Sequence, residues 1–296
     1  MPPASVPDVA SGQLEMPGMP RRLFAATPSK LATFTDCPRR YRHAYLDRPT
    51  PPKGPPWAHN SVGAAVHAAL RSWWDLPGAR RTVPAARHLL TGVWSTAGFR
   101  DAEQAERWRV RAAQWLTEYL TDADTADEPV GLERQVAATT GRLALSGRVD
   151  RIDQRGEELV VVDYKTGRVP STVDDARGST ALATYVLGVR RTLRRPCRRV
   201  ELHHLPSGTV AAFEHTDRSL DNHVRRAEDT ATDIERATEA LRAGSAPDEA
   251  FPAVPGRQCG WCDFRSSCPS GQAAGPAPAT WSFLAEEPAV PDGAAG

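Results

Sequence analysis

The sequence predicts an α/β protein. From about residue 131 its central part alternates apolar and polar residues with a period of two, whereas the regions before and after it repeat apolar residues with helical spacing. Three successive strands are expected over residues 132–139, 142–153 and 158–165. The short turns between them, at Thr140-Gly141 and Arg155-Gly156, favour a β-meander in which each strand pairs with the next.

Helices account for most of the remaining chain. Before the strands they are expected over residues 27–46, with a break at Cys37-Pro38, and over 60–74, 84–96 and 101–122. The part from about 60 to 122 would form a helical subdomain. After the strands we expect a helix over 179–193, a strand pair over 199–205 and 208–215, and a long polar helix over 217–243.

Composition places the chain among globular proteins. It has 296 residues, 40% of them hydrophobic, and a formal net charge of +1, which neither requires nor excludes a nucleic-acid partner. Residues 1–22 and about 271–296 are rich in Pro, Ala and Gly and are expected to be disordered tails around a single domain over 23–270. No apolar run has the length of a signal-peptide core or a membrane span, so a cytoplasmic protein without membrane contact is expected.

Charged residues interrupt two apolar strands in the segment SGRVDRIDQRGEELVVVDYKTG, residues 146–167. Asp163 and Lys165 are two residues apart on a strand and therefore share a face, and Asp150 can reach the same point across the hairpin. Half-buried carboxylates are costly unless they are paired or bind a cation. Two converging carboxylates predict a site for Mg²⁺ or Mn²⁺, with Asp150, Asp163 and Lys165 as catalytic residues.

The lysine adds to this prediction. Of the 37 basic residues only three are lysines, and one of the three is Lys165. A lysine can take part in proton transfer, whereas an arginine stays charged. The alternative is a solvated hairpin edge around Asp150 and a surface salt bridge between Asp163 and Lys165, which is the usual role of an isolated Asp-x-Lys.

The motifs GRVDRID and VVDYKTG, in this order, resemble motifs II and III of the RecB-type branch of the PD-(D/E)XK nuclease superfamily. Upstream, GAAVHAAL resembles the family's helix with a metal-binding histidine, which falls on His67. Downstream, ALATYVLGV resembles the helix that carries a Gln and a Tyr four residues apart. Tyr185 matches the Tyr, and Ala181 stands in place of the Gln. That departure concerns how this helix contacts the substrate strand and not the metal chemistry.

The resemblance covers roughly residues 27–270. It implies a restriction-endonuclease-like core, a mixed β-sheet flanked by helices, with an N-terminal helical elaboration and a C-terminal cysteine-bound segment. It also implies the metal ligands His67, Asp150 and Asp163. Outside this motif order His67 would be an ordinary helix histidine. Glu133, near the start of the strand before motif II, could lie near the metal or be a solvated strand-end carboxylate.

The activity implied by the resemblance is hydrolysis of phosphodiester bonds in DNA. The expected protein is a metal-dependent exonuclease of repair or recombination that acts on DNA that is single-stranded or has a free end. The alternative is a non-catalytic DNA-binding subunit of a helicase–nuclease complex, which would not need all four motif residues. The sequence has no Walker-type phosphate loop, so ATP-driven unwinding would require a helicase partner.

Three cysteines lie close together in CGWCDFRSSC, at Cys259, Cys262 and Cys268, and Cys37 is the candidate fourth ligand. In a reducing compartment such thiols are more often metal ligands than disulfides. One early and three late cysteines resemble the clasp of RecB-type nucleases related to AddB and to the CRISPR-associated exonucleases, which binds a structural [4Fe-4S] cluster. Zinc is the competing occupant, because four thiolates also suit Zn²⁺. Cys197 is expected to be a bystander.

An arginine-rich segment, RRTLRRPCRR, spans the end of the helix over 179–193 and the start of the next strand. Such runs are usually solvated, but beside a phosphodiester-cleaving site they would contact the DNA backbone without sequence preference. The expected DNA-binding residues are Tyr185, Arg190, Arg191, Arg194 and Arg195.

Overall fold

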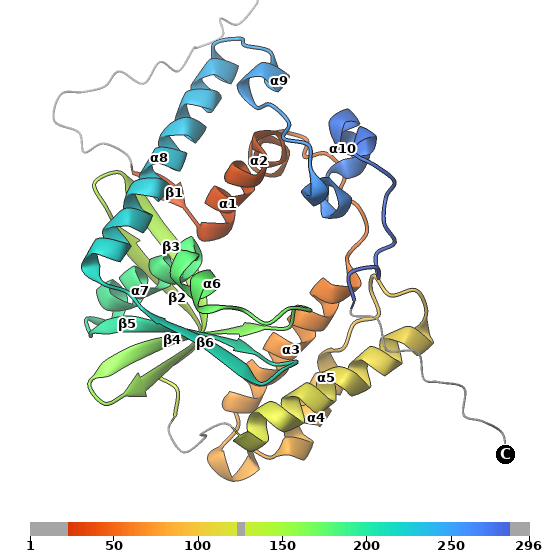
Figure 1. Cartoon of the computed structure of the whole chain (residues 1–296), viewed down its shortest axis with the longest axis vertical. Helices are drawn as coiled ribbons and strands as arrows, with labels where there is room; N and C mark the ends of the chain where they lie inside the picture. Colours follow the sequence, from red (N-terminus) through yellow and green to blue (C-terminus); the bar gives the residue numbers. More distant parts are fainter. Residues whose placement is uncertain (1–22, 123–127, 285–296) are drawn as a thin grey trace, which may run out of the picture.

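A mixed β-sheet flanked by helices forms the centre of the protein, as predicted (Figure 1). The computed structural model describes residues 23–122 and 128–284. The strands of this part are β1 (Phe24–Ala26), β2 (Gly131–Thr139), β3 (Leu143–Arg155), β4 (Glu158–Lys165), β5 (Cys197–His204) and β6 (Thr209–Glu214). Strands β2, β3 and β4 form the expected antiparallel meander, β5 pairs in parallel with β4, and β6 returns antiparallel to β5. Strand β1, which the sequence pattern did not indicate, pairs in parallel with the first residues of β3.

The predicted helices are present, with ends that differ by a few residues. They are α1 (Pro28–Asp36), α2 (Pro38–Tyr45), α3 (Ala58–Trp74), α4 (Val83–Val93), α5 (Ala102–Asp122), α7 (Thr180–Leu193) and α8 (Asp217–Arg242). The expected break between α1 and α2 occurs at Cys37, because Pro38 favours extended backbone at the residue before it. Short helices that were not predicted are α6 (Val173–Gly178), α9 (Pro247–Ala250) and α10 (Pro269–Ala273), together with the 3-10 turns Gly78–Arg80, Arg257–Trp261 and Arg265–Ser267.

Both faces of β4 are covered, which explains its nearly continuous apolar run. Val160, Val162 and Tyr164 pack against a cluster built by α3, α4 and α5. Leu159 and Val161 face the opposite way, onto α7. Figure 1 shows α3, α4 and α5 gathered at one side of the sheet, with α1 and α8 at the other. The alternation of the strand therefore decides which of its side chains meet which layer of helices.

Helix α7 is the crossover between the parallel strands β4 and β5. Such a connection must carry the chain from the end of one strand back to the start of the next. The beginning of α7 therefore lies near the end of β4, where Asp163 and Lys165 stand. The end of α7 lies near Cys197, which pairs with Leu159 at the start of β4.

The segment after the last predicted element is packed against the rest of the protein. Residues 271–284 were expected to belong to a disordered tail, and this expectation is wrong for them. The backbone N–H of Ala58 donates to the carbonyl of Thr280 at 3.1 Å, and Leu284 is buried against the cluster of α3 to α5. Apolar residues such as Trp281 and Leu284 find cover on distant helices, which local composition does not reveal. Residues 1–22 and 285–296, which are also predicted to be disordered, lie outside the described residues.

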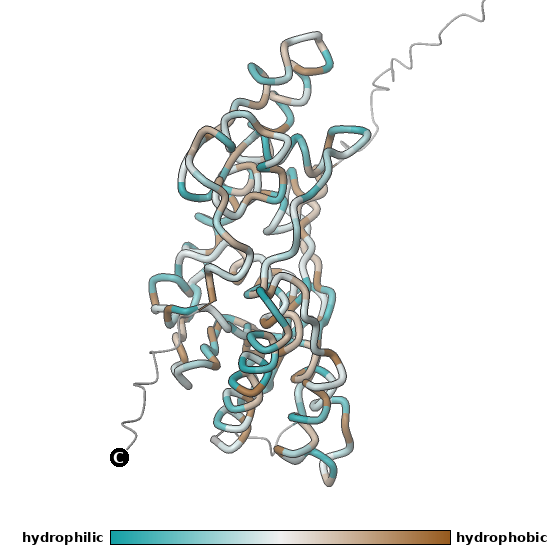
Figure 2. Tube along the Cα trace, turned by 90° about the vertical axis from the view of Figure 1, so that its right-hand side faces the viewer, coloured by the Kyte–Doolittle hydropathy of each residue, from teal (hydrophilic) through white to brown (hydrophobic). Residues whose placement is uncertain are grey.

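Hydrophilic and hydrophobic residues are interspersed along the whole trace and do not form long separate runs (Figure 2). Consistent with this, no helix among the described residues is long and apolar enough to cross a membrane.

Candidate functional site

Three carboxylates form one row across three neighbouring strands. The pairing of β2 with β3 passes over Glu133 and Asp150, and the pairing of β3 with β4 ends at Arg151 and Val162. Asp150 therefore follows directly on the paired part of β3, between Glu133 of β2 and Asp163 of β4. Residues that face each other across strands project from the same face of the sheet. Like charges in such positions repel one another. We call Glu133, Asp150 and Asp163 the acidic row. A bound cation would reduce the mutual repulsion of these carboxylates.

His67 of α3 completes the acidic row from the side. Its Nδ1 lies 3.3 Å from Oδ2 of Asp150, and its Nε2 lies 3.1 Å from the backbone carbonyl of Tyr164. The same Asp150 oxygen accepts the backbone N–H of Tyr164 at 2.9 Å. One peptide segment of β4 therefore orients both the imidazole and the carboxylate, which is how second-shell contacts commonly hold metal ligands.

Glu133 contributes a ligand atom that the predicted set of metal ligands did not include. One atom each of His67, Glu133 and Asp150 lie within 4.8 Å of one another. Glu133 has a φ of 44°, a conformation that is uncommon for a residue other than glycine. Strained backbone tends to persist where function requires it. The sequence indicated this ligand only weakly, because it placed Glu133 on the strand before Asp150. Only the folded structure brings the two side chains together.

Asp163 and Lys165 share a face, as predicted, and form an ion pair with 2.6 Å between Nζ and Oδ2. The Asp163 side chain is only 14% exposed, whereas that of Lys165 is 45% exposed and reaches the groove. Tyr164, between them, points to the opposite face. The pair is therefore not a solvated surface salt bridge. Asp163 is turned toward Lys165. Glu133, and not Asp163, is the carboxylate that groups closely with His67 and Asp150.

The pKa values of the site reflect crowded negative charge. Burial raises the pKa of Asp163, and the charge of Asp150 acts in the same direction against the ammonium of Lys165. Burial alone would lower the pKa of His67, but its hydrogen bond to Asp150 and the surrounding carboxylates raise it. Burial, with the charges of Asp163 and Asp150, also raises the pKa of Tyr185 to about 12. A bound cation would offset the negative charge that Asp150 and Asp163 place on their neighbours.

A groove of about 920 Å³ is lined by Glu133 and Asp150 of the acidic row and by His67, Lys165 and Tyr185, whereas Asp163 is not among its lining residues. Tyr185 of α7 lies against Gly147 of β3. A Cβ atom added to Gly147 would lie 2.5 Å from Cε1 of the tyrosine ring. The glycine of the GRVDRID motif therefore makes room for the tyrosine that the sequence resemblance singled out. Ala181, one turn earlier on α7, lines a neighbouring hollow that also contacts Tyr185.

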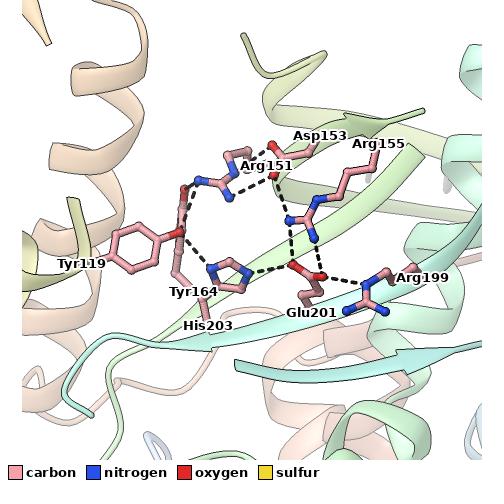
Figure 3. Close-up of polar contacts among 8 residues, drawn as sticks. All are labelled: Tyr119, Arg151, Asp153, Arg155, Tyr164, Arg199, Glu201 and His203. Atoms are coloured by element: carbon pink, nitrogen blue, oxygen red, sulfur yellow. Dashed lines mark hydrogen bonds and ion pairs between the residues drawn. The ribbon is translucent and has the colours of Figure 1, made fainter. Parts of the chain in front are cut away.

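A buried polar network lies on the other face of the same strands (Figure 3). Arg151 donates through Nη1 to the hydroxyls of Tyr119 and Tyr164, at 3.2 and 3.1 Å, and forms an ion pair with Asp153. The hydroxyl of Tyr119 lies 2.9 Å from Nδ1 of His203. The other ring nitrogen of His203 contacts the buried carboxylate of Glu201. Glu201 also accepts hydrogen bonds from Arg155 and Arg199. The network anchors the side chain of Tyr164, whose main chain orients the acidic row.

The arginine-rich segment is not beside the acidic row, and the expectation that it would be is wrong. Of the four arginines of the DNA-binding prediction, Arg190 and Arg191 lie in the last turn of α7, and Arg194 and Arg195 follow it, near the start of β4. At about 3.3 Å per strand residue this is roughly 20 Å from Lys165. Arg190 donates to the carbonyl of Cys197 at 2.6 Å, and Arg195 donates to Gln154 at 3.0 Å, so both support the sheet edge. The crossover geometry of α7 causes the separation.

Four cysteines converge from distant parts of the chain. Cys37 between α1 and α2 and the late residues Cys259, Cys262 and Cys268 line one small cavity. All of them are free thiols. Nη1 of Arg39 lies 3.9 Å from Sγ of Cys268, and the N–H of Gly271 donates to the same sulfur at 3.4 Å. Cys197 is buried in the core between α7 and the sheet, as expected of a bystander.

The fold and the site together define a class of protein. A mixed sheet that presents a row of carboxylates, an imidazole and an ammonium in one groove has the donor set of a metal-assisted nuclease. The sequence comparison agrees, because the model of the PD-(D/E)XK nuclease superfamily matches residues 25–269. The chain belongs to this superfamily, and its sheet with the flanking helices is the restriction-endonuclease-like core that was predicted.

Two solved structures are similar in outline. A candidate exonuclease from Eubacterium rectale has a TM-score of 0.44 and 10% identity, with 71% of this chain and 79% of that chain covered. The protein SSO0001 has a TM-score of 0.36 and 15% identity, with 83% of this chain and 86% of that chain covered. The comparison with curated proteins gave no match. Because both TM-scores are low, membership in the superfamily rests on the match of the family model.

Proposed function

We propose that the protein is a divalent-metal-dependent DNA exonuclease of the RecB-type branch. The observation that carries this proposal is the acidic row, with His67 and Lys165 beside it in one groove. Neighbouring carboxylates repel one another and suit Mg²⁺ or Mn²⁺, which prefer oxygen ligands. A role in repair or recombination follows from the sequence resemblance and belongs to the same proposal. So do a cytoplasmic location, expected from the lack of signal-peptide and membrane-span runs, and a helicase partner for any ATP-driven unwinding.

The residues of the groove fit a metal ion. His67 through Nδ1, Asp150 and Asp163 would hold it, and Glu133 is a further ligand. When bound, the ion supplies Lewis-acid stabilisation of charge at the phosphorus. The raised pKa of Asp163, caused first by burial, is consistent with a carboxylate built to face positive charge.

Lys165 is the catalytic lysine of the proposal. Its ammonium is partly exposed in the groove and is held by Asp163 at 2.6 Å. From this position it can hydrogen-bond to a phosphate oxygen or exchange a proton with the attacking water, and a contribution of about 10²- to 10⁴-fold is typical of such a group. Tyr185, held against Gly147, is proposed to contact the substrate strand in the same groove.

Digestion of end-labelled DNA with Mg²⁺ or Mn²⁺ tests the nuclease. Lys165→Met and Asp163→Asn should each lower the cleavage rate by at least about 100-fold. Lys53→Met, at an exposed lysine outside the groove, is the matched control and should cleave as the wild type does. Lys165→Arg should not restore activity, because the guanidinium keeps its proton.

The same assay decides between the enzyme and a DNA-binding subunit. If the wild-type protein binds DNA but releases no nucleotides from single-stranded or duplex ends with either metal, the exonuclease proposal fails. Shortening of labelled strands from one end supports it, and the position of the label gives the polarity. Release of internal fragments only would make the protein an endonuclease.

We further propose that the four cysteines hold a structural [4Fe-4S] cluster. They line one cavity, and the contacts of Arg39 and Gly271 with the sulfur of Cys268 favour negative charge there. A zinc ion with Zn–S bonds of about 2.3 Å brings its sulfurs within about 3.8 Å of one another. Zinc is the competing occupant, and metal analysis decides between the two. Bound there, the cluster would tie α2 to the C-terminal segment.

Iron, sulfide and zinc contents of anaerobically purified protein test the cluster. Brown protein with iron and sulfide supports the proposal, whereas colourless protein that contains zinc contradicts it. Cys37→Ser and Cys268→Ser should each lose the metal and lower the melting temperature. Cys197→Ala, at a cysteine in the sheet core, is the control and should keep the full iron content.

A further inference from the structure

A second, smaller pocket adjoins the groove of the acidic row. Its volume is about 220 Å³, and Thr166 and Gly167, which directly follow Lys165, line both cavities. Pockets for drug-sized ligands span about 300–1,000 Å³, so this one has room for a single ring system and not for a base pair. A nucleotide next to the one at the acidic row, along a bound DNA strand, would therefore lie beside this pocket.

The walls of this pocket are aromatic. Trp108 and Trp115 contribute from α5, with their ring centroids 5.9 Å apart, and Phe283 contributes from the C-terminal segment. We call the cavity that these three residues line the aromatic pocket. Aromatic side chains are the usual partners of unpaired bases, because every base has a face that can stack.

Within residues 23–122 and 128–284, two guanidinium groups at the aromatic pocket lack a carboxylate partner. Arg111 lies over the ring of Trp108, 5.0 Å from its centroid, and Arg168 is exposed at the end of the loop after Lys165. Neither forms a hydrogen bond or ion pair with the described residues, whereas Arg109 on the same helix is paired with Glu106. Unpaired guanidinium groups beside an apolar pocket are suited to the phosphate of a nucleotide whose base lies inside.

We propose that the aromatic pocket binds one unpaired nucleotide of the DNA strand whose neighbouring phosphate lies at the acidic row. The base packs against the aromatic walls, and its phosphate contacts Arg111 and Arg168. This inference rests on the proposed nuclease function and specifies its substrate. A base in this pocket cannot be paired, so the protein selects single strands or frayed ends over closed duplex.

Binding of the wild-type protein to two short labelled strands tests the base contact. One strand is built of thymidine nucleotides, and the other has the same length and phosphates but is abasic throughout. Fluorescence anisotropy in Ca²⁺ should show that the thymidine strand binds about tenfold more tightly, which corresponds to the stacking of one base. Equal affinity for both strands would overturn the proposal. The comparison uses only unaltered protein, so it does not depend on a variant folding.

A pair of double variants tests the guanidinium groups. Arg111→Met with Arg168→Gln should weaken binding of the thymidine strand about tenfold, since two phosphate contacts are lost. The control, Arg109→Met with Arg87→Gln, removes the same charge from α4 and α5 outside the pocket and should change the affinity less than twofold. Equal losses in the two double variants would show a general charge effect and would overturn the assignment.

Cleavage of the same thymidine strand in Mg²⁺ is measured separately. If the strand is bound with the expected base preference but is not cleaved, the nuclease proposal fails and the aromatic pocket stands as a nucleotide site. If the strand is cleaved but binds no better than the abasic strand, the pocket assignment fails and the nuclease proposal stands.

Discussion

His67 and Tyr164 are joined by a hydrogen bond that determines which imidazole nitrogen is free. The backbone carbonyl of Tyr164 can only accept, so Nε2 of His67, 3.1 Å away, carries the hydrogen. The protonated ring donates through Nδ1 to Oδ2 of Asp150, 3.3 Å away, and in the neutral ring Nδ1 keeps its lone pair for a metal ion. Metal-binding histidines are commonly oriented by such a contact. The groove therefore presents Nδ1 as a ligand atom.

His67→Ala should weaken Mn²⁺ binding by roughly 10- to 100-fold, because it removes this ligand atom and its anchor. Isothermal titration with Mn²⁺ measures the effect without cleavage. His88→Ala, at an exposed histidine of α4, is the control and should bind Mn²⁺ as the wild type does. An unchanged affinity in His67→Ala would remove the imidazole from the metal site.

Glu133→Gly should lower the affinity for Mn²⁺ without lowering stability. The residue has a φ of 44°, which glycine adopts freely and which is strained for glutamate. Gln135→Gly, two residues further along β2, should instead cost about 0.5–1 kcal/mol, since glycine in an ordinary strand position is destabilising. Denaturant unfolding of both variants gives the comparison. A loss of stability in Glu133→Gly as large as that in Gln135→Gly would contradict the strain argument.

Tyr164→Phe should leave the cleavage rate within about twofold of the wild type, because only the main chain of Tyr164 contacts His67 and Asp150. It removes one hydrogen bond from the buried network and should cost about 1 kcal/mol. Arg151→Met should cost about 3–5 kcal/mol, because it leaves the carboxylate of Asp153 without its closest partner in a buried network. Urea denaturation and the labelled-DNA assay separate the two effects. A large loss of cleavage in Tyr164→Phe at unchanged stability would place the hydroxyl in the mechanism.

His215 should make stability depend on pH. Burial, with the nearby charges of His223 and Arg190, lowers its pKa from 6.5 to about 4. Between these values the unfolded chain binds the proton and the folded protein does not, so stability falls as the pH drops from 6.5 toward 4, by at most about 3 kcal/mol.

His215→Phe removes this titration and should flatten the change in unfolding free energy between about pH 7 and pH 5. His88→Gln, at an exposed histidine, should keep the wild-type dependence. The assignment is wrong if His215→Phe loses as much stability on acidification as the wild type.

The local pattern of the chain was sufficient for the strands and for part of the site. Alternation with a period of two, bounded by turns, predicted β2, β3 and β4, and the two-residue spacing of Asp163 and Lys165 predicted their common face. These properties depend on neighbours along the chain, because side-chain direction in a strand follows from the backbone alone.

Other features depended on register, crossover and packing between distant segments. The folding of β2 and α3 beside β3 brought Glu133 and His67 close to Asp150, and the return of the chain through α7 carried Arg190 and Arg195 away from the acidic row. Residues of α5, of the loop after Lys165 and of the C-terminal segment together line the aromatic pocket, which no local pattern in the sequence indicated.

The sequence by itself thus determined which strands form and which charged residues share a face, since backbone geometry imposes both locally. Only the tertiary structure decided which carboxylates, arginines and aromatic rings meet. Those contacts are selected by burial of apolar surface between segments far apart in the chain, and no local periodicity records that selection.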